Sequence, residues 1–485
     1  MVPIHLRTLL SSSATSLLQE LTSVCSKYGD KGYTFAFSLS TNYSKSEELE
    51  TVFGQLAGFN KNNLQKGQTI GCLVEPPTGI YLPQENLQLR SSRADYISCS
   101  LAVFDSTNVI AFRSDLPSEE QPQVGRWHSF RKSAAGGSEI SLNESRSSAS
   151  NGPVDWEDVW ARSSLQSDAM PVLPQELQKA SDISHLIYFT APHPTQLTTA
   201  LSSHLPHATC LGLVAAPTHF ITGRAVSLFM NGKIYDSGAV GLAFKRPTES
   251  QSRVKCETTF AGFQRLSNPM LVTQTEGNML NAVKSMSPES STETLNPTSL
   301  LLRAIQQANL IAPTFKESED FALAVLSSPV AGDEKQPSIE QTYTITAGDP
   351  RNRGGALSLA GQLAPKPGSV VQFVHRPHNA PIVLPANKCT SSEQSTTKDT
   401  RITFVTVPEA LPNIMDGESA GAEHFDVGWP PLSLDSTFFA SSAQGFLLSR
   451  PQGNTTSSES LPSRTWTAIL PGTMATLTSG SNVGS

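Results

Sequence analysis

The sequence contains few charged residues and no long hydrophobic run. Charged residues occupy 16% of the 485 positions, and the formal net charge is −7, so no basic surface for nucleic acid is expected. No apolar run reaches the roughly 18 to 20 residues that a membrane-spanning helix needs. The sequence therefore predicts a soluble protein with neither a nucleic-acid nor a membrane partner.

Cysteine is also sparse. Six cysteines are widely spaced without a C-x-x-C pair, and three of them, Cys72, Cys99 and Cys210, lie in apolar, strand-like runs. This pattern favours buried, reduced thiols in an intracellular protein over the disulfide framework of a small secreted one. A cytoplasmic location is therefore expected. The alternative is mitochondrial, because residues 1–19 contain Arg7 and several serines but no acid, as in a transit peptide.

Motifs for phosphate binding, catalysis and metal binding are missing or incomplete. The glycine patterns of P-loops and dinucleotide sites do not occur. Ser419 lies in a G-x-S-x-G match, but the strand and helix that a nucleophile elbow needs do not flank it. His193, His204 and His207 lack the cysteine or carboxylate that would complete a tetrahedral zinc site. We expect no catalytic residue, metal site or cofactor, and we predict that the protein is not an enzyme.

Two strand–helix–strand units follow one another in the first half of the chain. In the first, strand-like residues 33–39 and 69–74 flank a helix with apolar residues at i, i+3, i+4 and i+7. The second repeats this spacing and ends at residues 210–214. Ile70-Gly71-Cys72 corresponds to Leu211-Gly212-Leu213, which indicates an internal duplication. The two units are expected to share one sheet with helices layered on it.

Antiparallel pairing is predicted as well. Asn231-Gly232 lies between two alternating segments and favours a type I′ hairpin turn, because both residues accept positive φ angles. Residues 238–244 continue as another strand. The predicted class is therefore α+β, with two mixed-sheet subdomains and helices layered on the sheets.

Polar stretches divide the chain into expected domains. Residues 1–30 are interpreted as an N-terminal helix or a targeting segment. The first domain is expected at 31–246, with a disordered insertion at about 130–153 that has almost nothing to bury. Residues 247–255 form a polar boundary. The second domain is expected at 256–480, with polar loop insertions.

Two glycine-bearing turns in the second half have ligand-binding chemistry. Glu276-Gly277-Asn278 follows a strand and presents an acid and an amide. Residues 348–355 combine Gly348, Gly354 and Gly355 with Arg351 and Arg353. Glycines let backbone amides approach a ligand, and guanidinium groups bind a carboxylate or phosphate. In the alternative interpretation, both segments are ordinary turns.

Motifs in a fixed order resemble the two-part FIST module of bacterial sensory proteins and of an F-box protein of animals. The N-terminal part, about 33–245, has Ile70-Gly71-Cys72, Thr222-Gly223-Arg224 and Gly238-Ala-Val-Gly241; the C-terminal part, about 260–375, has Gly262-Phe263, Asn268-Pro269-Met270, Glu276-Gly277-Asn278 and Gly348-Asp349-Pro350. The resemblance implies a non-enzymatic sensory scaffold in intracellular signalling. Such a scaffold binds a small polar ligand, with amino acids as candidates, a protein partner, or both.

Two alternatives remain beside this interpretation. One is a substrate-recruiting or regulatory subunit in ubiquitin-dependent protein turnover, although too few residues precede the first strand to form an F-box. The other is an enzyme of unrecognised type.

A ligand site follows if the glycine-bearing turns converge at strand ends, where clefts form in layered α/β proteins. Arg224, Arg351 or Arg353 would then hold a carboxylate while Glu276 takes an amine, as an amino acid requires. The alternative is four unrelated structural turns. The expected ligand-binding residues are Gly71, Cys72, Gly223, Arg224, Glu276, Gly277, Asn278, Gly348, Asp349, Arg351, Arg353, Gly354 and Gly355.

Overall fold

The computed structural model describes most of the chain. The described residues are 3–42, 46–60, 67–82, 87–88, 96–116, 172–180, 182–246, 254–286, 294–310, 319–327, 337–348, 355–361, 363–384, 399–409, 431–451 and 465–480. The insertion predicted at about 130–153 and Ser419 with its G-x-S-x-G match lie outside the described residues.

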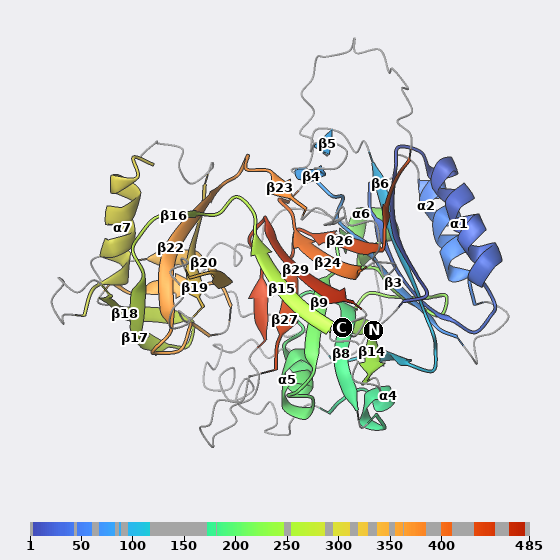
Figure 1. Ribbon diagram of the computed structural model, residues 1–485, viewed down its shortest axis with the longest axis horizontal. Coiled ribbons are helices and arrows are strands. Elements are labelled where there is room, and N and C mark those ends of the chain that lie inside the picture. Colours follow the sequence, from blue (N-terminus) through green and yellow to red (C-terminus); the bar gives the residue numbers. More distant parts are fainter. Residues whose placement is uncertain are drawn as a thin grey trace, which may run out of the picture.

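The first sheet has seven strands and carries two helices on its outer face, at the right of Figure 1. Its order is β13 (Lys233–Tyr235), β12 (Leu228–Met230), β3 (Thr69–Val74), β2 (Thr34–Ser40), β6 (Ile97–Phe104), β1 (His5–Ser11) and β25 (Leu432–Asp435). Helices α1 (Ala14–Tyr28) and α2 (Ser46–Ala57) pack on it through a shared apolar cluster that includes Leu17, Phe35 and Val52. The amphipathic stripe read from the sequence is therefore the buried face of α2.

The second sheet repeats this arrangement. Its order is β28 (Trp466–Ala468), β27 (Phe446–Ser449), β9 (Thr209–Val214), β8 (Ile183–Thr190), β14 (Ala239–Lys245) and β7 (Val109–Ser114). Helices α4 (Gln175–Gln178) and α5 (Thr195–His204) pack on its outer face. In each sheet a central parallel pair, β2–β3 or β8–β9, lies between antiparallel neighbours.

The internal duplication is confirmed at the level of single residues. Gly71 lies opposite Phe37 in the first parallel pair, and Gly212 lies opposite Tyr188 in the second. A Cβ atom on Gly71 would lie 2.5 Å from the Phe37 ring, and one on Gly212 would lie 2.2 Å from the Tyr188 ring. Each glycine therefore leaves room for an aromatic ring of the neighbouring strand. The expectation that both units share one sheet is wrong, because they form two sheets that meet across a common core.

A third sheet fills the space between the first two. It consists of β15 (Val254–Phe260), β29 (Thr473–Ser479), β24 (Thr400–Thr406) and β26 (Thr437–Ser442). Ile402, Phe404 and Phe438 from this sheet join the apolar core that the first two sheets share. All four strands lie beyond residue 250, so the C-terminal part of the chain completes the core of the N-terminal part.

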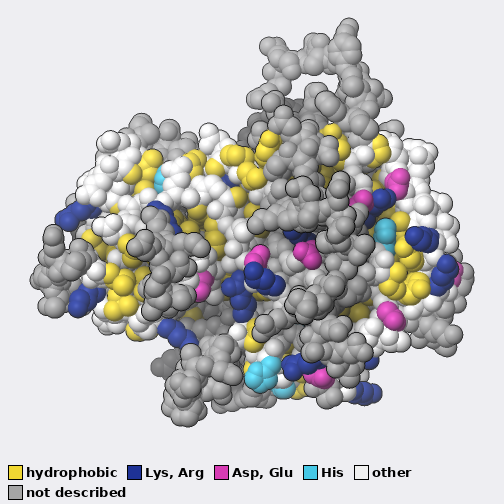
Figure 2. Space-filling model, in the orientation of Figure 1, with side chains coloured by type: hydrophobic (Ala, Val, Ile, Leu, Met, Phe, Trp, Pro, Cys, Tyr) yellow, Lys and Arg dark blue, Asp and Glu magenta, His cyan; other side chains and the backbone are white. Residues whose placement is uncertain are grey.

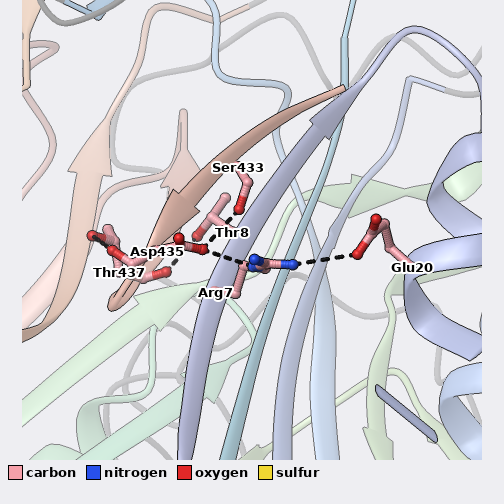
Figure 3. A network of polar contacts seen from close by, with 6 residues as sticks. All are labelled: Arg7, Thr8, Glu20, Ser433, Asp435 and Thr437. Atoms are coloured by element: carbon pink, nitrogen blue, oxygen red, sulfur yellow. Dashed lines mark hydrogen bonds and ion pairs between the residues drawn. The ribbon is translucent and has the colours of Figure 1, made fainter. Parts of the chain in front are cut away.

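The same C-terminal segment is tied to the first strand by polar contacts (Figure 3). The Arg7 guanidinium lies between two carboxylates, 2.8 Å from Asp435 Oδ1 and 3.3 Å from Glu20 Oε2. The Thr8 hydroxyl donates to the carbonyl of Thr437 at 2.8 Å. These contacts join β25 and the start of β26 to β1 and α1.

Seven further strands form a sheet of their own at the left of Figure 1. Their order is β16 (Gln264–Arg265), β22 (Val370–Pro377), β17 (Met270–Glu276), β18 (Met279–Ser285), β21 (Leu357–Leu359), β20 (Ile339–Gly348) and β19 (Glu319–Leu326), and a further pairing of β22 with β19 closes six of them into a barrel. Helix α7 (Pro297–Gln307) packs on the barrel through Leu301 and Ile305.

One buried arginine, Arg376, lies where the chain enters and leaves the barrel. Arg376 is 1% exposed, and its guanidinium donates to the carbonyls of Ala261, Pro377 and Ala380. A Cβ atom on Gly472 would lie 2.6 Å from Arg376 Nε. The chain segments that lead into and out of the barrel therefore meet around this side chain.

These observations confirm the α+β class with several mixed sheets and correct the expected boundaries. Residues 5–11, expected in a helix or targeting segment, form β1 inside the first sheet, with Leu6 and Leu9 in different apolar clusters. The predicted division at 247–255 does not separate two domains, because strands from 254–260 and 400–479 complete the N-terminal core. None of the helices in the described segments is long and apolar enough to cross a membrane.

Candidate functional site

Gly71 and Cys72 are part of a strand and not of a turn. Both lie in the middle of β3 and are buried. Gly71 faces Phe37, and burial raises the pKa of the Cys72 thiol well above its usual value. The expectation that they form a turn at a strand end is wrong, because the glycine instead allows close packing between β2 and β3.

Gly223 and Arg224 do form a turn. Gly223 ends the short helix α6 (His219–Thr222) with a φ of +71°, a left-handed conformation that glycine adopts without strain. Arg224 begins β11 (Arg224–Val226), and its guanidinium lies 3.8 Å from the Asp236 carboxylate. Both charged groups are largely exposed, so this ion pair is weak.

Glu276, Gly277 and Asn278 form the turn between β17 and β18. Gly277 has a φ of +54°, and Glu276 is exposed. The Asn278 amide donates to the carbonyl of Leu359 at 3.0 Å, and the backbone N–H of Leu359 donates to the Asn278 carbonyl at 3.0 Å. The turn is thereby fastened to β21.

The glycines at 348 and 355 serve packing. A Cβ atom on Gly348 would lie 2.7 Å from Leu357 Cδ2, and one on Gly355 would lie 1.7 Å from Asn296 Nδ2. Asn296 caps α7 by accepting from the backbone N–H of Ser299 at 2.9 Å. Gly355 thus makes room for this cap. The other residues expected here, Asp349, Arg351, Arg353 and Gly354, lie outside the described residues.

The predicted turns separate into two groups. The 276–278 turn and Gly348 belong to the barrel, where β18, β21 and β20 are neighbours. Gly71 lies in the first sheet, and Figure 1 places β3 and the barrel strands on opposite sides of the molecule. Arg224 lies in the N-terminal half near β12, not in the barrel. The structure therefore does not bring Arg224 and Glu276 into one amino-acid site.

A different cavity lies between the second sheet and the barrel. Its volume is about 1380 Å³. Three parts of the chain line it. The helix side contributes Pro192–Thr195, Thr198, Thr199, Ser202 and Val214, the barrel contributes Asn278, Val325, Glu340, Gln341, Tyr343, Thr346, Leu359, Ala360, Gly361, Leu363, Pro365, Lys366 and Ser369, and the C-terminal hairpin contributes Ala443, Gln444, Leu447, Leu448, Arg450, Pro451, Thr465, Trp466, Thr467 and Ile469. We call this cavity the cleft.

The cleft lies where the topology predicts a binding site. Pro192, His193 and Pro194 follow the carboxyl end of β8, and Val214 ends β9. In open α/β sheets, ligands bind outside the carboxyl ends of parallel strands. His193 has a φ of +56° between its two prolines, a conformation that is uncommon for residues other than glycine. This bend turns the chain from β8 into α5.

The floor of the cleft is formed by the end of the second sheet. Leu447 lies opposite Gly212 on one side and opposite Thr467 on the other. The corresponding residues of the first sheet are Phe229, opposite Gly71, and Ile234. In the first repeat these two positions carry Phe229 and Ile234. At the cleft the same positions carry the smaller Leu447 and the polar Thr467.

Contacts of the C-terminal hairpin hold the barrel wall in place. The Trp466 ring is buried, and its Nε1 donates to the carbonyl of Thr342 on β20 at 2.9 Å. On its other side the hairpin is tied to the third sheet, because Arg450 Nη2 donates to the Thr258 hydroxyl of β15 at 3.2 Å. On the barrel side, the Tyr343 hydroxyl donates to Gln341 Oε1 at 3.2 Å. The cleft is thus bounded by structured walls.

Hydroxyl and amide groups dominate the polar lining of the cleft. Among the described residues, its acidic, basic and imidazole side chains are His193, Glu340, Lys366 and Arg450. Figure 2 shows charged side chains of both signs scattered over one face of the molecule, without a large patch of one sign. Such a lining suits hydrogen bonding to a polar, weakly charged ligand.

The described residues contain no group of three or more His, Cys, Asp or Glu side chains that could hold a metal ion. The cysteines in apolar strands are free and buried, and burial raises the pKa values of Cys99 and Cys210 to about 12. Their thiolates are therefore scarce at neutral pH.

Sequence reasoning identified only one residue of the cleft as a ligand contact, Asn278. The Pro-His-Pro sequence before α5 is a local signal for an unusual strand-to-helix turn. The hairpin residues carry no such signal, because their place at the cleft depends on long-range pairing of β27 with β9.

No known family model matches the chain, and no curated protein matches it significantly.

Proposed function

We propose that the protein is a non-enzymatic binding scaffold of the FIST type that takes up a polar ligand in the cleft and acts in intracellular signalling. The observation that carries this proposal is the place of the cleft, at the carboxyl ends of β8 and β9 and between the second sheet and the barrel. Ligands that contact both parts would couple binding to their relative position. The FIST resemblance supports the proposal through Asn278, which belongs to the Glu276-Gly277-Asn278 motif of that resemblance and lines the cleft.

Thermal unfolding in the presence of each of the twenty amino acids tests this proposal. A ligand at 100 times its dissociation constant stabilises the folded state by about 2.7 kcal/mol. Thr467→Trp places a bulky ring on the cleft floor and should abolish the shift. The matched control is Thr22→Trp, on the exposed side of α1, which should leave the shift intact. Equal shifts in both variants would place binding elsewhere.

A second candidate function, recruitment of a protein for ubiquitin-dependent turnover, is favoured by one surface feature. Phe220 on α6 is fully exposed, with a relative accessibility of 105%, and Ile221 beside it is 37% exposed. The hydroxyls of Thr218 and Thr222 each bond the Ser227 hydroxyl, at 2.9 and 2.8 Å. An exposed aromatic side chain on a short helix that these hydrogen bonds hold in place is suited to anchor a protein partner.

Affinity purification with mass spectrometry tests this second function. Wild-type protein should enrich ubiquitin-ligase subunits, and Phe220→Ser should lose them. Ile4→Ser is the matched control, because Ile4 is an exposed apolar residue on another part of the surface. Purification without any ligase subunit would argue against recruitment and leave the cleft proposal unaffected.

A further inference from the structure

The cleft is larger than a free amino acid requires. Its volume of about 1380 Å³ exceeds the roughly 300 to 1,000 Å³ of sites that enclose drug-sized molecules. Its lining extends from α5 across β27 and β28 to the barrel. A single amino acid would contact only a fraction of these walls, so the dimensions favour a longer ligand.

The chemistry of the walls combines apolar and neutral polar groups. Leu363 on the barrel side is 45% exposed and Ile469 on the hairpin side is 36% exposed, and both line the cleft. Around them lie Thr, Ser, Asn and Gln side chains, whose groups both donate and accept hydrogen bonds. A polypeptide presents the same mixture, because backbone N–H and C=O groups alternate with side chains.

The charged groups at the cleft favour an acidic ligand. Among the described residues of the lining, Lys366 and Arg450 are cationic, whereas Glu340 is the one acidic side chain. The described side chains of the lining therefore carry a net positive charge. The buried Trp466 ring, 4% exposed, offers no open platform of the kind on which nucleic-acid bases stack.

Strand order supplies a further contact for a peptide. β28 is the terminal strand of the second sheet, so among the described strands it pairs only with β27. Thr465, Thr467 and Ile469 alternate along this segment, and all three line the cleft. Terminal strands accept extended peptides through backbone hydrogen bonds, while alternate side chains set the specificity.

We propose that the ligand of the cleft is an extended peptide segment with apolar side chains and at least one acidic side chain. This inference rests on the proposed function of the cleft and names its ligand class. A peptide in this position would contact the second sheet and the barrel together, so its binding would fix the position of the barrel.

Selection from a random heptapeptide library displayed on phage tests the inference with the full-length protein. Enriched sequences should share apolar residues and an Asp or Glu. A fluorescein-labelled synthetic peptide of the enriched sequence then serves as the probe in fluorescence polarisation. Thr467→Trp should weaken its binding at least tenfold, whereas Thr22→Trp should not change it.

Charge is tested separately. Lys366→Glu should weaken binding about three- to fivefold, the size of an exposed ion pair, and replacing the acid of the peptide by its amide should remove this difference. Lys233→Glu, at the exposed first residue of β13 in the first sheet, is the charge-matched control and should bind like wild type.

The outcomes separate the two proposals. If amino acids stabilise the protein in a Thr467-dependent manner but no peptide is enriched, the peptide inference is wrong and the proposed cleft function stands. If neither amino acids nor peptides depend on Thr467, both proposals fail. A peptide that binds Thr467→Trp as tightly as wild type also overturns the inference.

Discussion

We expect Arg376→Met to loosen the junction between the barrel and the rest of the molecule. The guanidinium donates from Nε to the Ala261 carbonyl at 3.1 Å, from Nη1 to the Pro377 carbonyl at 3.3 Å, and from Nη2 to the Ala380 carbonyl. Methionine keeps much of the side-chain volume but removes every donor. The three carbonyls would then lose their charged partner.

Opposing terms set the magnitude of this effect. A hydrogen bond to a charged group contributes roughly 1.5 to 3 kcal/mol, and a buried carbonyl left unpaired costs about 1 to 3 kcal/mol. Burial lowers the pKa of Arg376 by disfavouring the charged form, although the Asp320 carboxylate acts in the opposite direction. Removing the charge relieves this desolvation. We expect a net loss of about 3 kcal/mol in the free energy of unfolding.

Urea-induced unfolding measures this loss, with Trp466 at the barrel contact as one of its fluorescent reporters. Arg265→Met is the control, because Arg265 is an exposed arginine on β16, which pairs with β22 of the barrel, and its replacement should change stability by at most about 0.5 kcal/mol. Limited proteolysis should also release the barrel earlier from Arg376→Met than from wild type. Equal unfolding free energies for the two variants would refute the reasoning.

Two further predictions concern the second sheet. Gly212→Ala should lower the free energy of unfolding by about 1 to 3 kcal/mol, because its Cβ would overlap the Tyr188 ring. The control is Gly54→Ala, on α2 with open space around it, which should be neutral or stabilising by up to about 1 kcal/mol. Urea unfolding in which Gly212→Ala is the more stable of the two variants would contradict this packing. Burial lowers the pKa of His185 to about 3, so between about pH 6.5 and 3 the unfolded state binds one more proton than the folded state. The free energy of unfolding therefore decreases by about 1.4 kcal/mol for each unit by which the pH is lowered through this range. His185→Phe should flatten that slope in pH-dependent unfolding; an unchanged slope would show that other groups cause it.

Local patterns predicted the parts of the fold that local forces determine. The Asn231-Gly232 hairpin forms as expected, with φ angles of +50° and +76°. The glycine correspondence between the two strand–helix–strand units also holds in the structure. Both features depend on residues that are neighbours along the chain or repeat at fixed spacing.

Long-range pairing could not be read in the same way. Leu6 and Leu9 fit a helical stripe, yet they lie in β1 because β6 and β25 supply partners on both sides. β25 comes from residues more than 400 positions away, and nothing in the local pattern of residues 5–11 marks that partner. The expected domain boundary was wrong for the same reason.

The cleft follows from the duplication once the differences between the repeats are considered. In the first repeat, Phe229 packs against Phe53 of α2 and Phe37 of β2, with ring centroids 4.4 and 5.6 Å apart, and Ile234 pairs beside it. The second repeat has Leu447 and Thr467 in the corresponding positions.

The smaller side chains leave the end of the second sheet without that aromatic cover, and α5 turns Thr195, Thr198 and Thr199 toward the gap. The barrel then closes the gap from the opposite side. One register therefore produces packed core in the first repeat and a polar cleft in the second. Thr467 pairs with Leu447 and lines the cleft, so replacing it by a large ring should fill part of the gap, and this is why that variant is the sharpest test of binding.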